Sequence, residues 1–344
     1  MAGGRKLHVR TRWTAAAASV ALVLAGVAVA PALARDSGQR AGHTAVPRSL
    51  PVRGPAATHD PSMVRARDGS YYVFSTHNGI EIRHSRDRVH WRFVGEVLPN
   101  GAAWAGDYQP APSKDAWAPD VSFHHGRYYV YYAISSFGSN HSAIGLATSP
   151  SARPGTWTDQ GLVFASQPSD DYNAIDPALT VDRRGRWWLS FGSFWGGIKM
   201  LRLDPTTGKP LSSSPRLYSL AQRPAPDAVE GAVIHRHGRY YYLFASYDFC
   251  CRGLDSTYKI KVGRSRSITG PYVDEAGRAL MDDGGTTILA THGDEIGPGG
   301  QSVLRDRHRD LLVFHYYDRA DAGTPRLGID VLRWRHGWPV VSGP

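Results

Sequence analysis

One supersecondary unit recurs along this 344-residue chain and constrains its fold more than any other feature. Each copy continues from a short polar head into an apolar run, a turn containing Gly or Asp, and a strand dense in aromatic residues. Four copies carry an acid at the head, spaced 54 to 60 residues apart: Asp60, Asp120, Asp176 and Glu230. This spacing is that of a four-stranded blade with long loops, so the repeat predicts a β-propeller.

A fifth copy lacks the acid. It runs from Gly300–Leu304 into the aromatic strand Leu311–Tyr317. Runs of Tyr, Trp, Phe, Val and Ile separated by turn residues dominate the rest of the chain, and no amphipathic helical period accompanies them. We therefore expect an all-β, five-bladed β-propeller. Because the first strand of every blade surrounds the central axis, the acids should converge at one mouth.

The N-terminus has the pattern of a secretory signal peptide over residues 1–34. Four basic residues precede an apolar run of 16 residues, Ala15–Ala30, and a small-residue cleavage site follows at Ala32-Leu33-Ala34. A membrane anchor is the competing interpretation, but the run is short and rich in Ala. We expect a secreted, extracellular protein that has no membrane association after cleavage. Residues 35–55 resemble a disordered lead-in, and residues 56–344 form one propeller catalytic domain.

The net charge of +10 raises the question of a nucleic-acid partner. Four positive charges and no acids lie in residues 1–34, so subtracting 4 from 10 leaves +6 on the remaining chain. The other basic residues stand mostly in turns such as Arg183-Arg184 and Arg305–Arg309, where solvated surface is the simpler explanation. No nucleic-acid fold signature is present, so we expect no such partner, and we expect a monomer.

The two cysteines of the chain are neighbours, Cys250 and Cys251. Residues adjacent in sequence cannot join distant segments, so a long-range disulfide is excluded. They are either free and buried or joined in a vicinal ring that stiffens the loop Asp248–Leu254. A metal site is the least favoured interpretation, since no Cys or His pair at zinc spacing accompanies them.

The recurring acids suit glycoside hydrolysis. That reaction needs one carboxylic acid to protonate the leaving oxygen and one carboxylate to activate water or to attack. A third acid nearby can keep Glu230 protonated while Asp60 stays ionised, since like charges push pKa values apart. The alternative is a structural acid that joins neighbouring blades, as repeated Asp residues do in WD-type propellers. The position of the acids at the head of the first strand favours catalysis.

Nine motifs, in order across the five blades, resemble those of family 43 glycoside hydrolases of the endo-1,5-α-L-arabinanase type. The resemblance covers residue 56 to the C-terminus. The motifs are His59-Asp60-Pro61, Trp117–Val121, Asn173–Pro177, Gly192–Ile198, Val229-Glu230-Gly231, Phe249–Gly253, Ser256-Thr257-Tyr258, Gly297–Gly300 and Phe314–Asp318.

The resemblance implies a five-bladed propeller that inverts the anomeric centre. It implies that Asp60 is the general base, that Glu230 is the general acid, and that Asp176 orients the acid and tunes its pKa. Asp120 is left as a structural or outer group.

The resemblance also implies a set of residues beside the bound sugar. These predicted substrate-binding residues are Trp117, Asn173, Ile175, Ser193, Phe194 and Trp195. Burial in a blade core is the alternative for Trp195. Two further aromatic residues, Trp104 and Tyr108, either stack on outer sugars or anchor their loop.

Relatives of this type often hold a cation, commonly calcium, near the catalytic acids through a His and water. The candidate ligand here is His315 in the fifth blade, with a hydrogen-bonded core role as its alternative. Some relatives carry a His after Gly-Pro-Gly, where this chain has Gly300 and then Gln301.

Together these features predict a secreted endo-acting arabinanase that cleaves internal α-1,5-L-arabinofuranosyl linkages of arabinan in pectin side chains. The alternatives are an exo-acting α-L-arabinofuranosidase or β-xylosidase on the same fold, and a non-catalytic sugar-binding propeller.

Overall fold

The computed structural model describes residues 49–110 and 114–342. The predicted signal peptide, residues 1–34, and residues 35–48 of the predicted lead-in lie outside the described residues.

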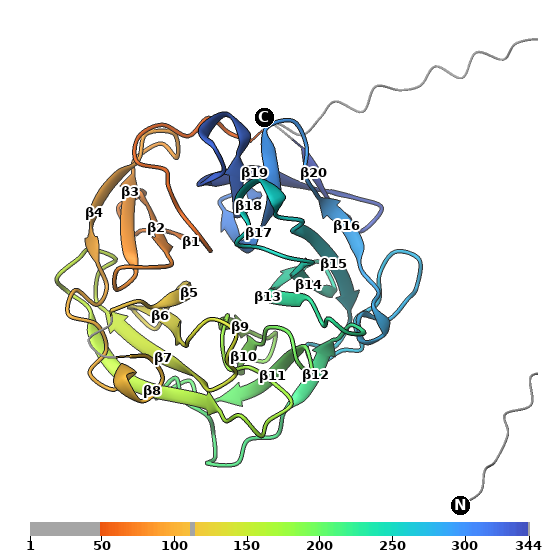
Figure 1. Ribbon diagram of the computed structural model, residues 1–344, viewed down its shortest axis with the longest axis horizontal. Coiled ribbons are helices and arrows are strands. Elements are labelled where there is room, and N and C mark those ends of the chain that lie inside the picture. Colours follow the sequence, from red (N-terminus) through yellow and green to blue (C-terminus); the bar gives the residue numbers. More distant parts are fainter. Residues whose placement is uncertain (1–48, 111–113, 343–344) are drawn as a thin grey trace, which may run out of the picture. The chain divides into compact units, whose positions relative to one another are not determined.

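Five four-stranded antiparallel sheets succeed one another around a centre, and each is built from four consecutive strands (Figure 1). The innermost strands are β1, β5, β9, β13 and β17 (Figure 1). The prediction of an all-β five-bladed propeller is therefore confirmed.

The strands are grouped here by blade. Blade 1 contains β1 (Ser62–Arg65), β2 (Tyr71–Ser75), β3 (Glu81–Ser85) and β4 (Arg92–Glu96). Blade 2 contains β5 (Trp117–His124), β6 (Arg127–Ile134), β7 (Ser142–Ser149) and β8 (Thr158–Ser166). Blade 3 contains β9 (Ala178–Val181), β10 (Trp187–Phe191), β11 (Ile198–Leu203) and β12 (Tyr218–Ala221). Blade 4 contains β13 (Val229–His237), β14 (Tyr240–Tyr247), β15 (Lys259–Ser265) and β16 (Thr286–Leu289). Blade 5 contains β17 (Glu295–Asp306), β18 (Arg309–Asp318), β19 (Thr324–Arg335) and β20 (Trp338–Ser342).

Helix in the described part of the chain is limited to four short 3-10 turns. These are η1 (Ala105–Asp107), η2 (Gly253–Asp255), η3 (Leu280–Asp282) and η4 (Arg319–Asp321). Among the described residues there is no helix long and apolar enough to cross a membrane.

The aromatic strands supply the core between blades. Phe74 of blade 1 packs in one cluster with Val130 and Tyr132 of blade 2, and Tyr131 of blade 2 packs in another with Trp187 of blade 3. All but Val130 are among the largest fully buried side chains. Because alternate residues of a strand face opposite sides of the sheet, a strand such as β6 fills the wedge on both of its faces.

Residues 49–58 close the ring between blades 5 and 1. The N–H of Leu50 donates to the carbonyl of Ile329 at 2.8 Å, and the N–H of Arg53 donates to the carbonyl of Val89 at 2.7 Å. Leu50 and Val52 also pack against the apolar cluster shared by the two blades. The end of the predicted disordered lead-in, residues 49–55, is therefore part of the propeller. The segment contains two Pro and one Gly, and its order comes from contacts with distant strands.

Asp306 joins blades 5 and 1 at the far end of the first strands. Its carboxylate accepts hydrogen bonds from Tyr71 Oη at 2.9 Å and from Arg88 Nη1 at 3.0 Å. Arg65 Nε lies 3.6 Å from the same group. The Asp306 side chain is only 6% exposed, so the arginines and the tyrosine replace the water that its charge would otherwise bind.

We predict that Asp306→Asn lowers the free energy of unfolding by about 2 to 4 kcal/mol, because two arginine charges lose their buried partner. Urea denaturation followed by circular dichroism measures this change. The exposed Asp107→Asn serves as the matched control and should stay within about 0.5 kcal/mol of the unmodified protein. Equal effects of the two substitutions would contradict the role of Asp306.

Candidate active site

In each blade a residue in the left-handed backbone region lies two positions before the first strand begins its continuous pairing with the second strand. The φ angle is 47° at Asp60, 43° at Ala118, 56° at Asp176, 60° at Gly231 and 55° at Gly300. Asp tolerates this conformation better than most side chains, and Gly accepts it without strain. These five residues are therefore the equivalent positions of the repeat.

This register corrects the assumption that the four acids occupy one position. Asp60 and Asp176 are equivalent, Glu230 comes one residue before its left-handed Gly231, and Asp120 comes two residues after Ala118. A one-residue shift changes the direction of a side chain, and a two-residue shift moves it along the strand. The acids therefore have different surroundings.

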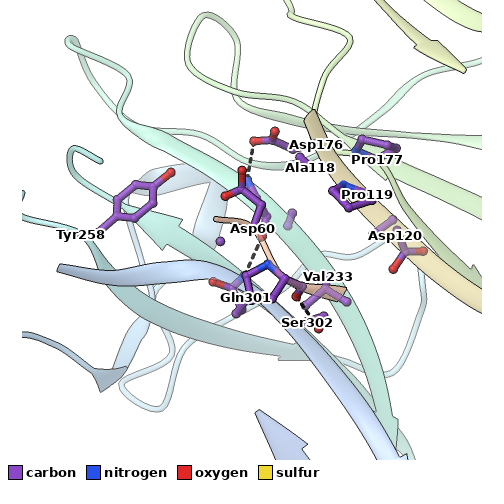
Figure 2. Close-up of a pocket in the computed structure, with 15 residues that line it drawn as sticks. Asp60, Ala118, Pro119, Asp120, Asp176, Pro177, Val233, Tyr258, Gln301 and Ser302 are labelled. Atoms are coloured by element: carbon purple, nitrogen blue, oxygen red, sulfur yellow. Dashed lines mark hydrogen bonds between the residues drawn. The ribbon is translucent and has the colours of Figure 1, made fainter. Parts of the chain in front are cut away.

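The heads of all five first strands surround a small central cavity of about 40 Å³, enough for one or two water molecules. Asp60, Asp176 and Tyr258 line it (Figure 2), and Gly231 and Gly300 belong to the same lining. The predicted convergence of the repeats is thus present in the structure. Glu230 is adjacent to the lining residue Gly231 and shares a β-bridge with Ser193.

Asp120 forms a bond between blades. Its Oδ2 accepts the N–H of Leu179 in blade 3 at 2.8 Å, as the Ser62 hydroxyl accepts the N–H of Val121 at 3.0 Å one blade earlier. Burial raises the pKa of Asp120 to about 6, against the hydrogen bonds that lower it. Figure 2 shows its carboxyl group directed away from those of Asp60 and Asp176. This placement agrees with a structural role.

The Asp60 carboxylate is held by three side chains. Its Oδ2 lies 2.8 Å from His59 Nδ1 and accepts the Thr76 hydroxyl at 2.7 Å. His315 Nδ1 lies 3.6 Å from the other oxygen. Burial alone would raise the pKa of Asp60, but the two histidines and Thr76 together lower it below its ordinary value. Asp60 is therefore ionised at neutral pH.

Gly300 leaves the space that the Asp60 carboxylate fills. A Cβ at position 300 would lie 2.3 Å from Asp60 Oδ1 and 2.8 Å from His315 Nδ1. The left-handed backbone at this residue would strain any other side chain as well. The fifth repeat lacks an acid because its head has no room for one.

Glu230 is buried between two hydroxyl groups. Ser193 Oγ donates to its Oε2 and Tyr258 Oη donates to its Oε1. Burial raises the pKa of Glu230, the two hydroxyl groups lower it, and the negative charge of Asp60 raises it further. The net direction is upward, so Glu230 retains its proton to higher pH than an exposed glutamate.

Asp176 is buried in the same group of acids. Its Oδ2 accepts the N–H of Gly231 at 3.0 Å, which ties it to the residue after Glu230. Burial, then the charges of Glu230 and Asp60, raise the pKa of Asp176 well above its ordinary value. Because three acids in one desolvated site cannot all ionise, the negative charge resides on Asp60.

The predicted sugar-binding residues divide into buried and half-exposed ones. Asn173, Ile175 and Ser193 are buried, and Asn173 Oδ1 has no hydrogen-bond partner among the described residues. Ser193 holds the Glu230 carboxyl group, which makes it a positioning residue as well as a candidate for sugar contact. Ile175 accepts the N–H of Gly192 and so fixes the start of the Gly192–Ile198 loop.

Phe194 and Trp195 follow Ser193 in left-handed conformations, with φ angles of 53° and 44°. Both are half-exposed, and neither belongs to an apolar core cluster of the described chain. This placement favours sugar contact over the core alternative for Trp195. Trp117 is also half-buried, and its Nε1 donates to Asp115 at 2.8 Å.

Trp104 and Tyr108 anchor their loop. Both pack against the core cluster of blades 1 and 2, and Trp104 stacks on Tyr132 at 6.0 Å between ring centroids. The anchor alternative, left open by the sequence, is the one that the structure shows.

Cys250 and Cys251 form a vicinal disulfide. The N–H of Cys251 donates to Tyr317 Oη at 2.7 Å, and Tyr317 Oη lies 3.0 Å from His59 Nε2. His59 in turn contacts Asp60 through Nδ1. A chain of hydrogen bonds therefore runs from the disulfide loop to the ionised acid and fixes the orientation of the His59 ring.

Thr76 and Tyr258 contact the acids directly, although the sequence assigned them no role. Tyr258 belongs to the motif Ser256-Thr257-Tyr258, so its presence in the motif was the available signal. Thr76 follows an aromatic strand and carries no distinguishing pattern.

The family model of glycosyl hydrolases family 43 matches residues 51–339. The chain belongs to this family. An extracellular endo-α-(1→5)-L-arabinanase of Bacillus subtilis is 44% identical over 286 residues, which are 82% of this chain and 86% of that protein. An extracellular exo-α-(1→5)-L-arabinofuranosidase of Cellvibrio japonicus is 40% identical over 299 residues, which are 83% of this chain and 86% of that protein.

A solved structure of a family 43 endo-arabinanase from Bacillus licheniformis superposes with a TM-score of 0.80 at 45% identity. The match covers 85% of this chain and 99% of that chain. This member of family 43 is therefore a glycoside hydrolase with the propeller of its solved relatives.

Proposed function

We propose that this family 43 enzyme hydrolyses internal α-1,5-L-arabinofuranosyl linkages of arabinan. One observation carries the proposal: Asp60, whose pKa is lowered, and Glu230, whose pKa is raised, share a buried site at the propeller centre. The pair provides the base and the acid that glycoside hydrolysis requires. The names of the endo-acting relatives supply the substrate.

In the proposed reaction, Asp60 accepts a proton from water while the water oxygen attacks the anomeric carbon. Glu230 gives its proton to the glycosidic oxygen as the bond from that oxygen to the anomeric carbon breaks. The attack comes from the face opposite the leaving group, so the configuration inverts. Afterwards Asp60 holds a proton and Glu230 is ionised, and exchange with water restores both.

Asp176 acts on this reaction through Glu230. Its carboxyl group is held by the N–H of Gly231, so it stays beside the acid without contacting the leaving oxygen itself. Whenever Asp176 ionises, its charge raises the pKa of Glu230 and helps that acid keep its proton.

Exo action is the second candidate, because a relative named as an exo-acting arabinofuranosidase is 40% identical to this chain. The endo assignment is better supported, since the most similar relative and structure reported above both carry endo names.

We further propose secretion as a monomer. The extracellular names of both relatives and the signal-peptide pattern of residues 1–34 support secretion. Arabinan of plant cell walls is an external polymer, which fits this location.

His315 fits the expected cation. It is 0% exposed, and its Nε2 has no hydrogen-bond partner among the described residues. His59, Asp60 and His315 also bring potential ligand atoms within 4.8 Å of one another. A calcium ion would be held by His315 Nε2 and water, and it would supply positive charge beside the acids. In this structure His315 Nδ1 accepts the N–H of Asp60 at 3.1 Å. Binding of calcium at Nε2 would place the His315 proton on Nδ1, so this hydrogen bond would be lost.

We predict that calcium added to EDTA-treated protein raises the midpoint of thermal unfolding by a few degrees, corresponding to about 2 to 3 kcal/mol at a hundredfold excess over Kd. His315→Gln should abolish the rise. A rise that persists in this variant, or no rise in the unmodified protein, would show that His315 holds no calcium.

We predict that Ser193→Ala moves the basic limb of the pH–kcat/KM profile to higher pH. Removing the Ser193 hydroxyl takes away a hydrogen bond that lowers the pKa of Glu230, so the acid loses its proton later. The groups that still act on Glu230 are Tyr258, Asp60, His59 and Asp176.

The exposed Ser213→Ala is the control and should leave the profile unchanged. A raised KM with an unmoved basic limb would instead assign Ser193 to sugar binding alone.

We predict that Glu230→Gln lowers kcat on linear debranched arabinan by roughly 10²- to 10⁴-fold with folding retained, because the amide has no proton to give. Circular dichroism checks folding, and chromatography of early products from the unmodified enzyme reports the mode of action. Mixed oligosaccharides support endo action and monosaccharide alone supports exo action.

Asp120→Asn is the matched control, because this buried acid lines the central cavity and bonds the neighbouring blade. It should keep the activity per folded molecule. Full activity of Glu230→Gln would refute the acid assignment.

A further inference from the structure

The turns after the first strands carry a strong excess of positive charge. Each turn lies at the end of its strand away from the acids. The distance is roughly 20 Å, because about six residues with a rise of about 3.3 Å each separate the head of the strand from the turn. The five turns contain eleven arginines, five histidines and three aspartates. They are residues 65–69, 124–127, 182–186, 235–239 and 305–309. Arginines that are scattered in the sequence are thus gathered on the face of the propeller opposite the active site, which we call the far face.

A groove of about 890 Å³ opens on the far face where blades 5, 1 and 2 meet. Five arginines line it: Arg65, Arg86, Arg92, Arg153 and Arg307. Asp68 is the one acid in its lining, and it lies 3.9 Å from Arg153. The groove therefore has the volume of a ligand site and a strong excess of positive charge.

Three of these arginines have no carboxylate of their own. Arg86, Arg92 and Arg307 are exposed and form no ion pair with any described acid, whereas Arg65 lies against the buried Asp306. The charges of the groove arginines act on the neighbouring His84. Burial lowers the pKa of His84 in the groove wall, and Arg92, Arg86 and Arg153 lower it further. The mutual repulsion of these arginines destabilises the folded protein unless anions bind to this surface.

We propose that this groove binds the carboxylates of a polyuronate, an acidic polysaccharide. The guanidinium group pairs with a carboxylate through two parallel hydrogen bonds, so a row of free arginines matches a polymer with regularly spaced acids. The inference rests on the proposed function: arabinan is neutral, but it is carried as side chains on the acidic backbone of pectin. Holding one acidic chain would raise the local concentration of the side chains that the opposite face cuts.

The groove suits nucleic acid and membranes less well. Its aromatic residues, Tyr72 and His84, are buried and pack against each other with ring centroids 4.8 Å apart and ring planes tilted by 57°, so no free ring faces a base. A concave groove between blades also offers no flat apolar surface to a bilayer.

The test compares two triple variants of the protein. Arg86→Ala/Arg92→Ala/Arg153→Ala removes three groove charges. The matched control, Arg202→Ala/Arg216→Ala/Arg333→Ala, removes three exposed arginines that do not line the groove. Binding to polygalacturonate is measured by calorimetry at low and high salt, with fully methyl-esterified polygalacturonate as the uncharged probe.

The unmodified protein and the control variant should bind polygalacturonate, with affinity that falls as salt rises, and should not bind the esterified polymer. The groove variant should bind at least about tenfold more weakly, because three donors of charge-assisted hydrogen bonds are removed. Equal binding by both variants, or binding of the esterified polymer, would overturn the proposal. So would tighter binding of single-stranded DNA or of phosphatidylglycerol vesicles by the unmodified protein.

Hydrolysis of free debranched arabinan should be unchanged in the groove variant, because none of its three arginines is near the acids. This assay separates the two proposals. Loss of polyuronate binding leaves the arabinanase assignment standing, and absence of arabinan hydrolysis in the unmodified protein refutes the arabinanase assignment on its own.

Discussion

The site depends on keeping three carboxyl groups in one desolvated space. Burial and mutual repulsion oppose ionisation of all of them, so the protein must determine which one carries the charge. Asp60 is selected by His59, Thr76 and the neighbouring His315. With that charge fixed, Glu230 and Asp176 both shift toward their protonated forms. One stabilised anion thus sets the state of the other two acids.

The propeller provides this arrangement through a repeated backbone conformation. A left-handed residue at each strand head turns the chain into the centre, and the side chain at that position projects toward its equivalents. Two of the five positions hold Asp, two hold Gly and one holds Ala. The glycine at position 300 leaves the volume that Asp60 fills, so the differences between repeats are coupled across the centre.

Much of the fold and part of the candidate site could be predicted from the sequence, because the repeat length, the aromatic strands and the acids at the strand heads are local patterns. The five blades and the convergence of Asp60 and Asp176 follow from them. The exact register could not be predicted, since a shift of one or two residues at Glu230 and Asp120 depends on backbone angles. The role of Ser193 beside Glu230 was also missed, because it arises from contact between two blades.

The clustering of the turn arginines and the order of residues 49–55 also depend on contacts between segments distant in sequence. Turn arginines that look like isolated surface residues in sequence gather on one face only when the blades are placed in a ring. Residues 49–55 look disordered by composition, yet they bond to blades 1 and 5. In both cases the deciding information is which segments become neighbours.

The closure between blades 5 and 1 has a consequence for the lifetime of the enzyme. Among the described residues no strand is exchanged between the first and last blades, which are held by the N-terminal segment, a shared apolar cluster and side-chain hydrogen bonds. The same junction contains the stack of His59 on His315 and the bond from Asp60 N–H to His315. A brief separation of these blades would therefore disperse the partners of Asp60 while four blade junctions stay intact. Heat would therefore inactivate the enzyme below the temperature at which the whole propeller unfolds. An engineered covalent link across this one junction would extend the lifetime of its activity.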